Sequence, residues 1–360
     1  MKPSPDVPNP DRDAAKAGGE GARADGRRRP ASIQDVANAA EVSIATVSRV
    51  LNTPSVVASE TSRRVLEAIE RLGYVPNPFA KGLITRSSRV LGLALPDLHG
   101  EFYSGLLRGA DEAARAAGYH LLVSSEARGN GGRGARELGA GLVDGLAMMV
   151  TEPDAALIRE ARQTRLPLVV VDAQLDEASG LDCVLVDNAS GTIQATEHLL
   201  ASTPADQVYF VGGPASNFDT ARRAEAFLGV LKARGHVAQD AQTAFGDYSA
   251  AWGTKWMEQA LARGAKRLGV LAANDEIALG VLQAATDAGL SVPGDVRIVG
   301  FDDTRLAQIV RPHLSSVRVP ILEIGAAAVK ALIARIESPD APRSMVTMRT
   351  ELVVRESSGG

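Results

Sequence analysis

Four predicted strands are each followed closely by a side chain that can bind a polar ligand. Asp97 follows the apolar run V-L-G-L-A-L-P, and Asp172 follows P-L-V-V-V. Asn274 follows L-G-V-L-A-A, and Asp302 follows R-I-V-G-F. Carboxylates and amides can each bond two neighbouring hydroxyl groups, and open α/β sheets bind ligands at the carboxyl ends of their strands. The pattern predicts a polar cleft, although an Asp or Asn after a strand can also simply cap the next helix.

A second set of residues able to bind a ligand lies in residues 32–52, where the pattern predicts two short helices joined by a tight turn. Ser32 and Asp35 match a capping box, and Ser43 can cap the second helix, predicted over Ile44–Leu51. The outward side chains of that helix are Ile44, Ala45, Ser48 and Arg49. Small side chains let a helix approach the DNA major groove, where an Arg can bond both O6 and N7 of a guanine.

The residues of this stretch also carry a family resemblance. The run D-V-A followed by V-S-x-x-T-V-S-R-V-L-N closely resembles the DNA-binding headpiece of the LacI/GalR family of bacterial transcription regulators. The resemblance implies an effector-responsive repressor, not an enzyme, that binds a pseudo-palindromic operator DNA as a homodimer. The alternative is a helical hairpin that only packs. The predicted DNA-binding residues of the headpiece are Ser43, Ile44, Ala45, Thr46, Ser48, Arg49 and Asn52.

Two features of the headpiece depart from the family pattern or restrict its readout. Glu41 stands in the turn where Gly is common, and a left-handed conformation costs such a residue about 1 kcal/mol. Either the turn relaxes or it tolerates Glu. Ile44 and Ala45 donate no hydrogen bond, so we expect them to read thymine methyl groups or DNA shape.

The predicted headpiece is completed by a third helix and a hinge. The third helix runs from Ser59, which we expect to cap it, to Leu72, with Gly73 as its stop. In the family that the chain resembles, the following hinge helix forms on operator binding and places a leucine in the minor groove. The matching residue is Leu83, an apolar wedge that would bend the duplex. The alternative is an ordinary linker with one exposed leucine.

From residue 90 onward, apolar strands alternate with amphipathic helices, and the alternation then begins again. This pattern predicts two α/β lobes with parallel sheets and a cleft between them. It resembles the periplasmic-binding-protein-like core of the same family, in which the chain crosses between lobes three times. We expect these crossings near Val186–Ala189, Pro312–Val317 and Met345–Thr347.

The predicted fold is therefore an all-α helix-turn-helix headpiece followed by an α/β core of two periplasmic-binding-protein-like lobes. The expected domains are a disordered tail (1–31), the DNA-binding headpiece (32–76), a hinge helix and linker (77–89), and an effector-binding and dimerisation core (90–355). Lobe 1 is expected over about 90–186 and 316–345, and lobe 2 over about 187–315 and 346–355.

The family resemblance implies contacts to an effector, a sugar or other small polar molecule, in the cleft. The family pattern R-x-x-G-F places an effector-binding Arg at Arg223, with Ala226 where Gly is usual. The full set implied is Asp97, Phe102, Asp172, Arg223, Tyr248, Asn274 and Asp302. Tyr103 and Phe301 are further aromatic candidates, because aromatic faces can cover the apolar side of a sugar ring.

Composition is consistent with a DNA-binding end and an acidic body. Residues 1–89 hold 14 Lys and Arg against 10 Asp and Glu, whereas residues 90–360 hold 25 against 33. Arg27, Arg28 and Arg29 can add phosphate contacts or only solvate the tail. The single cysteine, Cys183, excludes an intrachain disulfide and favours a reducing compartment. With no signal peptide and no apolar run of membrane-spanning length, we expect a cytoplasmic protein.

Other classes of function have weaker support. Gly129-x-Gly131-x-x-Gly134, with Glu152 after the next strand, suggests a nucleotide-dependent oxidoreductase, but residues 126–128 separate the motif from its strand. A sugar-binding transport component would share the core but would need a signal peptide and no headpiece. No catalytic or metal-binding motif occurs, and we expect neither cofactor nor metal. No apolar heptads follow Arg355, which favours a homodimer over a tetramer.

Overall fold

A computed structural model gives the fold of the chain. It describes residues 29, 31–75, 87–98, 100–125, 142–152, 159, 163, 166–173, 175, 179–265 and 267–359. Outside these residues lie the predicted wedge Leu83, the arginines Arg27 and Arg28, and the glycine motif at 129–134. The chain divides into two compact units at Asn77 and Pro78.

The N-terminal unit is a three-helix headpiece whose first two helices begin at capping serines. Its elements are α1 (Ile33–Ala39), α2 (Ile44–Asn52), the 3-10 turn η1 (Pro54–Val56) and α3 (Ser59–Leu72). The predicted capping box is confirmed: the Ser32 amide donates to the Asp35 carboxylate at 2.8 Å, and the Asp35 amide donates to Ser32 Oγ at 3.3 Å. One side chain from each helix, Val36, Val47 and Val65, is fully buried in the shared core.

The two ends of α3 show what local sequence can and cannot specify. Gly73 ends the helix as predicted, at a left-handed φ of 61°. The predicted cap at Ser59 is wrong, because Ser59 is already helical and Ala58 stands at the N-cap without a side-chain hydrogen bond. The backbone therefore enters the helix one residue earlier than the nearest capping side chain suggests.

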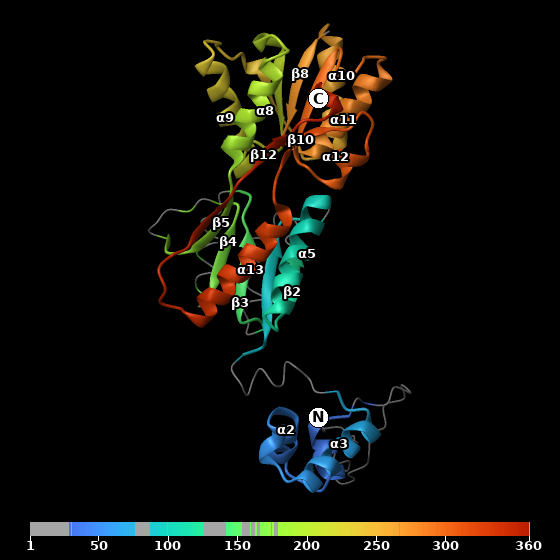
Figure 1. The fold of residues 1–360 in the computed structure, drawn as a ribbon, viewed down its shortest axis with the longest axis vertical. Coiled ribbons are helices and arrows are strands. Elements are labelled where there is room, and N and C mark those ends of the chain that lie inside the picture. Colours follow the sequence, from blue (N-terminus) through green and yellow to red (C-terminus); the bar gives the residue numbers. More distant parts are fainter. Residues whose placement is uncertain are drawn as a thin grey trace, which may run out of the picture. The chain divides into compact units, whose positions relative to one another are not determined.

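The larger unit holds two six-stranded sheets, one in each lobe (Figure 1). In spatial order, the lobe 1 sheet is β11 (Met345–Met348), β5 (Asp182–Val186), β4 (Leu168–Val171), β3 (Gly145–Met149), β1 (Val90–Leu95) and β2 (His120–Ser125). The lobe 2 sheet is β12 (Glu351–Val353), β10 (Ser315–Arg318), β9 (Val296–Asp302), β8 (Leu268–Ala272), β6 (Val208–Gly212) and β7 (Thr243–Phe245). All pairs are parallel except β10 with β12. The continuous apolar runs are explained by strands β1, β3, β4 and β8, which are buried throughout.

Helices cover both sheets. Those described are α5 (Glu101–Ala116) and α13 (Ile321–Glu337) in lobe 1, and α8 (Asn188–Leu200), α9 (Phe218–Ala233), α10 (Ala250–Ala262), α11 (Asp275–Asp287) and α12 (Arg305–Ile309) in lobe 2. Short 3-10 turns lie at Ala205–Gln207, Asp240–Gln242 and Glu356–Ser358. Helix α13 comes from the C-terminal part of the chain but lies beside α5 (Figure 1). The two helices approach closely at Gly109, where an added Cβ would collide with the carbonyl oxygen of Leu322.

The later crossings between lobes lie beyond the positions predicted for them. Residues 316–318 were expected in lobe 1, but β10 carries them in the lobe 2 sheet, so the chain crosses at residues 319–320. Residues 346–348 were expected in lobe 2, but β11 pairs with β5 in lobe 1, so the chain returns at residues 349–350. An apolar run marks a strand, but it does not mark the sheet that the strand joins.

Candidate functional site

Helix α2 has the capped, two-sided form that its sequence predicts. The Thr46 amide donates to Ser43 Oγ at 3.1 Å, and Asn52 Nδ2 donates to the Ser48 carbonyl at 2.8 Å. The side chains of Ser43 and Asn52, with Thr46 Oγ1 at 2.9 Å from Ser43 Oγ, therefore fix both ends of the helix. Val47 on the inward side is fully buried.

The outward side of α2 is small, apolar and carries one cation. Ile44 is 42% exposed, Ala45 and Arg49 are exposed, and Ser48 is half-buried. No described residue engages the Arg49 guanidinium in a hydrogen bond or ion pair. A helix with this surface can enter a major groove, where Arg49 would meet base edges and Ile44 a thymine methyl group.

The turn before α2 keeps the left-handed conformation despite its glutamate. Glu41 has a φ of 53° and its side chain is exposed. Arg64 on α3 reaches back to donate to the carbonyl oxygens of Ala40 and Glu41. The turn therefore tolerates Glu rather than relaxing, and a tertiary hydrogen bond from α3 braces it.

Arg223 lies at the centre of the predicted cleft residues in lobe 2. It is only 4% exposed, and its guanidinium lies over the Phe301 ring at 3.6 Å from the centroid. Its Nε donates to Asn188 Oδ1 at 2.7 Å, and Nη1 donates to the Ala273 carbonyl. Three different elements thus hold this cation in place, which is the arrangement expected of a fixed ligand-binding group.

Asp172 is a carboxylate buried at the end of β4. It follows β4 at a φ of 65° and is 6% exposed. Neither of its oxygens has a hydrogen-bond partner among the described residues. Burial raises the pKa of Asp172 well above its usual value, and the nearby carboxylates of Asp219 and Asp302 raise it further, whereas Arg223 opposes the shift.

Asp302 is the corresponding residue at the end of β9. It is 8% exposed and has a φ of 102°, which an aspartate rarely adopts. Burial raises the pKa of Asp302, Arg223 lowers it, and Asp275, Asp219 and Glu276 raise it. Asp172 from lobe 1 and Asp302 from lobe 2 therefore belong to one electrostatically connected group around Arg223.

Tyr248 and Asn274 are held by bonds within lobe 2. The Tyr248 hydroxyl donates to Asn217 Oδ1 at 2.8 Å and lies 2.7 Å from Thr220 Oγ1. Burial raises the pKa of Tyr248. Asn274 caps α11, accepting from the Ile277 amide at 2.8 Å, and its Nδ2 donates to the Tyr248 carbonyl at 3.2 Å. The capping role considered for Asn274 is thus present.

Lobe 1 contributes aromatic side chains to the same region. Phe102 is half-buried and packs edge-to-face on Tyr103 at 5.5 Å between ring centroids. Asp97 is exposed, and its Oδ1 accepts from the Leu98 amide at 2.6 Å. Burial raises the pKa of Tyr103, and the carboxylates of Asp97, Asp172, Asp219 and Asp302 add to the shift.

Three residues of this group were not among the predicted contacts. The structure adds Tyr103, which sequence reasoning named only as an aromatic candidate, together with Asn188 and Asp219. Asn188 Nδ2 donates to Asp219 Oδ1 at 2.7 Å, so the two join Arg223 to a further carboxylate. Both lie in the first turns of helices, where a polar residue usually indicates only a helix start.

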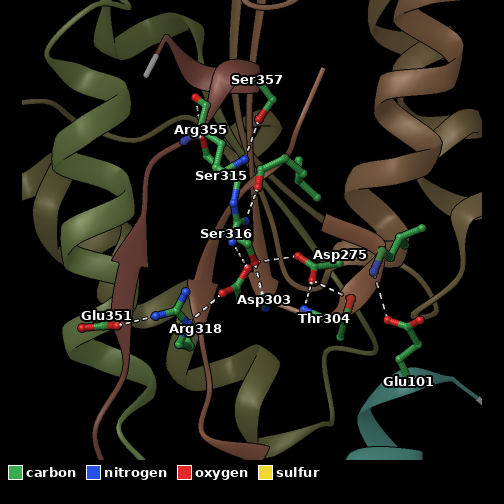
Figure 2. Close-up of polar contacts among 12 residues, drawn as sticks. Glu101, Asp275, Asp303, Thr304, Ser315, Ser316, Arg318, Glu351, Arg355 and Ser357 are labelled. Atoms are coloured by element: carbon green, nitrogen blue, oxygen red, sulfur yellow. Dashed lines mark hydrogen bonds and ion pairs between the residues drawn. The ribbon is translucent and has the colours of Figure 1, made fainter. Parts of the chain in front are cut away.

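A network of ion pairs and hydrogen bonds joins Asp275 and Asp303 to their neighbours (Figure 2). Asp275 Oδ1 accepts from Ser316 Oγ at 2.6 Å, and Oδ2 accepts from the Thr304 amide at 2.8 Å. Asp303 pairs with Arg318 at 2.8 Å and with Arg355 at 2.6 Å. These bonds fix the loop at residues 302–304, which leads from β9 to α12.

The two lobes contact each other directly. The Leu306 amide in lobe 2 donates to Glu101 Oε2 in lobe 1 at 3.0 Å (Figure 2). On another side, the Phe218 amide donates to the Thr151 carbonyl at 2.8 Å, and Ser216 Oγ donates to Glu152 Oε1 at 2.9 Å. Glu152, considered above as a ribose ligand, thus serves in a lobe-to-lobe contact.

The described part of the chain offers neither a metal site nor a membrane-spanning helix. No group of three or more His, Cys, Asp or Glu residues there is arranged to hold a metal ion. Within the same residues, no helix has the length and apolar character needed to span a bilayer.

Comparison with known proteins identifies the two units independently. Residues 32–77 match the model for bacterial regulatory proteins of the lacI family, and residues 196–358 match the model for a periplasmic binding protein-like domain. The chain is 32% identical over 330 residues to catabolite control protein A of Priestia megaterium, covering 91% of this chain and 99% of that protein.

Solved structures agree over the same length. The lac repressor dimer bound to operator and the anti-inducer ONPF is 28% identical with a TM-score of 0.81, and the complex of the transcriptional regulator CelR with cellobiose is 26% identical with a TM-score of 0.70. Each match covers 91% of this chain and 99% of the other. These matches to the headpiece and to the two-lobed core show that the chain belongs to the LacI family of bacterial transcription regulators and is not an enzyme.

Proposed function

We propose that the protein is a cytoplasmic, homodimeric repressor that binds a pseudo-palindromic operator and responds to a sugar or other small polar effector held between its lobes. The observation that carries the proposal is α2, which presents exposed Ile44, Ala45 and Arg49 opposite buried Val47. The lac repressor, to which the chain is similar, was solved as a dimer on its operator. The cellobiose complex of CelR supports a sugar as effector.

In this proposal each headpiece reads one half of the operator. Arg49 bonds a guanine, Ile44 and Ala45 contact thymine methyl groups, and Ser48 lies beside them. Ser43, Thr46 and Asn52 orient the helix and reach the phosphates from its ends. Leu83 acts as the minor-groove wedge. Two-fold symmetry of the dimer then requires two half-sites in inverted order.

The effector site is proposed to combine residues of both lobes. Lobe 1 contributes Asp97, Phe102 and Asp172, and lobe 2 contributes Arg223, Tyr248, Asn274 and Asp302. An effector that bridges the lobes can shift the balance between their open and closed arrangements. The size of that shift equals the difference between the free energies with which the effector binds the two arrangements. Because such coupling is reciprocal, an effector that weakens operator binding must itself bind more weakly to the operator complex.

Selection of bound duplexes from a random pool tests the DNA-binding part of the proposal. We expect an enriched inverted repeat that the purified protein retards in a mobility-shift assay, with strong dependence on salt concentration. A panel of sugars is then added to that complex. A sugar that changes the shift supports the regulatory proposal, whereas failure to enrich any inverted repeat would contradict it.

A further inference from the structure

The turn that leads from α1 into α2 places a glutamate where the backbone favours glycine. The Glu41 amide donates to the Asn38 carbonyl at 3.2 Å, and the Val42 amide donates to the Ala37 carbonyl at 3.0 Å. With Glu41 at a φ of 53°, these two bonds form a Schellman motif, whose left-handed position is usually a glycine. The carbonyl oxygens of Ala40 and Glu41 take no part in the two bonds, and they point to a further donor.

Arg64 on α3 is that donor. Its Nη2 donates to the Ala40 carbonyl and, at 3.4 Å, to the Glu41 carbonyl. Helix α1 has no basic residue in its last turn, so Arg64 also supplies the cation that favours a helix C-terminus. The adjacent Val65 is fully buried in the headpiece core, which anchors the part of α3 from which Arg64 extends. One side chain of the third helix therefore holds the backbone that joins the first two.

We propose that Arg64 is a positioning residue for DNA recognition: by holding the turn, it sets the direction in which α2 presents Arg49 and Ile44 to the major groove. This inference rests on the proposed function and adds to it a residue that acts through the protein backbone. Without the bonds from Arg64, Glu41 leaves the left-handed region, which is sterically unfavourable for a residue with a Cβ. The angle of α2 then changes, and readout of base edges depends on how that helix lies in the groove.

A direct bond from the Arg64 guanidinium to a DNA phosphate is the alternative, and its consequences differ. A phosphate contact adds affinity for every duplex and adds to the salt dependence of binding, whereas positioning of α2 affects only the duplex whose bases are read. The neighbouring Arg63 offers a matched control, because its guanidinium bonds Glu60 and Glu67 within α3.

Mobility shifts of the full-length protein on the selected duplex and on a scrambled duplex of equal length, over a range of salt concentrations, test the proposal. Arg64→Ala should reduce the ratio of the two affinities about tenfold, the loss expected for one hydrogen bond from a charged donor. Its affinity for the scrambled duplex and its salt dependence should stay unchanged, and Arg63→Ala should keep the full ratio. Equal losses on both duplexes, with a salt slope smaller by about 1, would identify a phosphate contact and overturn the inference.

The variant Glu41→Gly separates positioning from a general loss of headpiece stability. Glycine adopts the left-handed conformation without steric cost, so the turn keeps its shape when Arg64 is absent. In the Glu41→Gly background, Arg64→Ala should therefore reduce the affinity ratio by less than about threefold, because the two residues act on one turn and their effects are coupled. A general contribution of Arg64 to stability would be lost equally in both backgrounds, and equal losses would overturn the inference.

The original protein separates failure of this inference from failure of the proposed function. If it binds the selected and the scrambled duplex equally well, the repressor proposal fails, and this inference fails with it. If it discriminates between them and Arg64→Ala discriminates equally well, only the assignment of Arg64 is wrong and the repressor proposal stands.

Discussion

At the scale of single residues, Arg49 is the side chain on which base recognition is expected to depend. It is the one cation on the outward side of α2, and it is exposed. Replacement by Ala should reduce discrimination between the selected operator and a single-base variant by about 1–3 kcal/mol. Arg49→Lys keeps the charge but loses the bidentate geometry, so it should preserve non-specific affinity and still lose discrimination. Competition mobility shifts measure both, and unchanged discrimination in Arg49→Ala would contradict the assignment.

Glu41 offers a second test at this scale, since it combines an unfavourable φ with an unfavourable charge. At a φ of 53°, replacement by Gly should relieve strain and stabilise the headpiece by about 1 kcal/mol or less, because the added freedom of the unfolded chain offsets part of the gain. Glu41→Gln removes only the charge, so it should leave stability unchanged while improving affinity for DNA at low salt. Calorimetric unfolding and mobility shifts separate the two effects. Equal stability of both variants would argue against strain.

The buried carboxyl group of Asp275 is expected to make the stability of the protein depend on pH. Burial raises its pKa to about 7, and the carboxylate of Asp303 adds to the shift, while bonds from Ser316 and Thr304 oppose it. The folded protein therefore binds a proton between about pH 4 and pH 7 that the unfolded chain has released, so stability is lost as pH rises through 7. Asp172 and Asp302 contribute in the same direction.

Melting temperatures measured from pH 5 to pH 8 test this prediction. The original protein should melt at a lower temperature as pH rises, and Asp275→Asn should show a shallower decline, because the amide does not titrate. Asparagine can still accept from the Thr304 amide, which preserves the loop. Identical slopes for the two proteins would show that Asp275 does not titrate in this range.

At the scale of secondary-structure elements, close helix packing depends on glycines that lie in contact with a neighbouring helix. A Cβ at Gly109 in α5 would collide with the backbone of α13, so Gly109→Ala should destabilise the core by about 1–3 kcal/mol. Gly229 lies within α9 with no atom near an added Cβ. Gly229→Ala should therefore stabilise by about 0.5–1 kcal/mol. Urea unfolding measures both, and equal effects would refute the packing argument.

The elements also show which features of the structure the sequence makes visible. The capped starts of α1 and α2 were predicted because the capping residues lie within three positions of each other in the chain. The short edge strand β7 was not predicted, because three residues give too little periodicity. The crossings after β10 and β11 were misplaced because sheet membership depends on partners distant in sequence.

The same distinction applies to the candidate site. Positions after buried strands located Asp172 and Asp302, since strand ends are readable from apolar runs. Asn188 and Asp219 were missed because their importance arises from Arg223, which is distant in the sequence from Asn188. That neither Asp172 oxygen has a hydrogen-bond partner among the described residues likewise becomes visible only in three dimensions.

At the scale of the whole molecule, communication between cleft and DNA requires that the balance between lobe arrangements be adjustable. The bond from the Leu306 amide to Glu101 contributes to that balance, because it joins α12 of lobe 2 to α5 of lobe 1. Thr304 stands at the N-cap of α12 but makes no side-chain capping bond to it. Glu101 thus acts as a helix cap supplied by the opposite lobe, and separation of the lobes breaks it.

Glu101→Ala should accordingly shift the balance away from the observed arrangement by about 1 kcal/mol, the usual contribution of a helix cap. A ligand that bridges the lobes would then bind about fivefold more weakly, and by reciprocity its effect on operator affinity would require a correspondingly higher concentration. Glu101→Gln keeps an acceptor for the Leu306 amide and should behave almost as the original protein. Isothermal titration measures ligand affinity, and mobility shifts across a ligand series measure coupling. If Ala and Gln variants matched the original protein in both measurements, the Glu101 contact would carry no part of the coupling, and the remaining contacts at Thr151 and Glu152 would have to hold the lobes together.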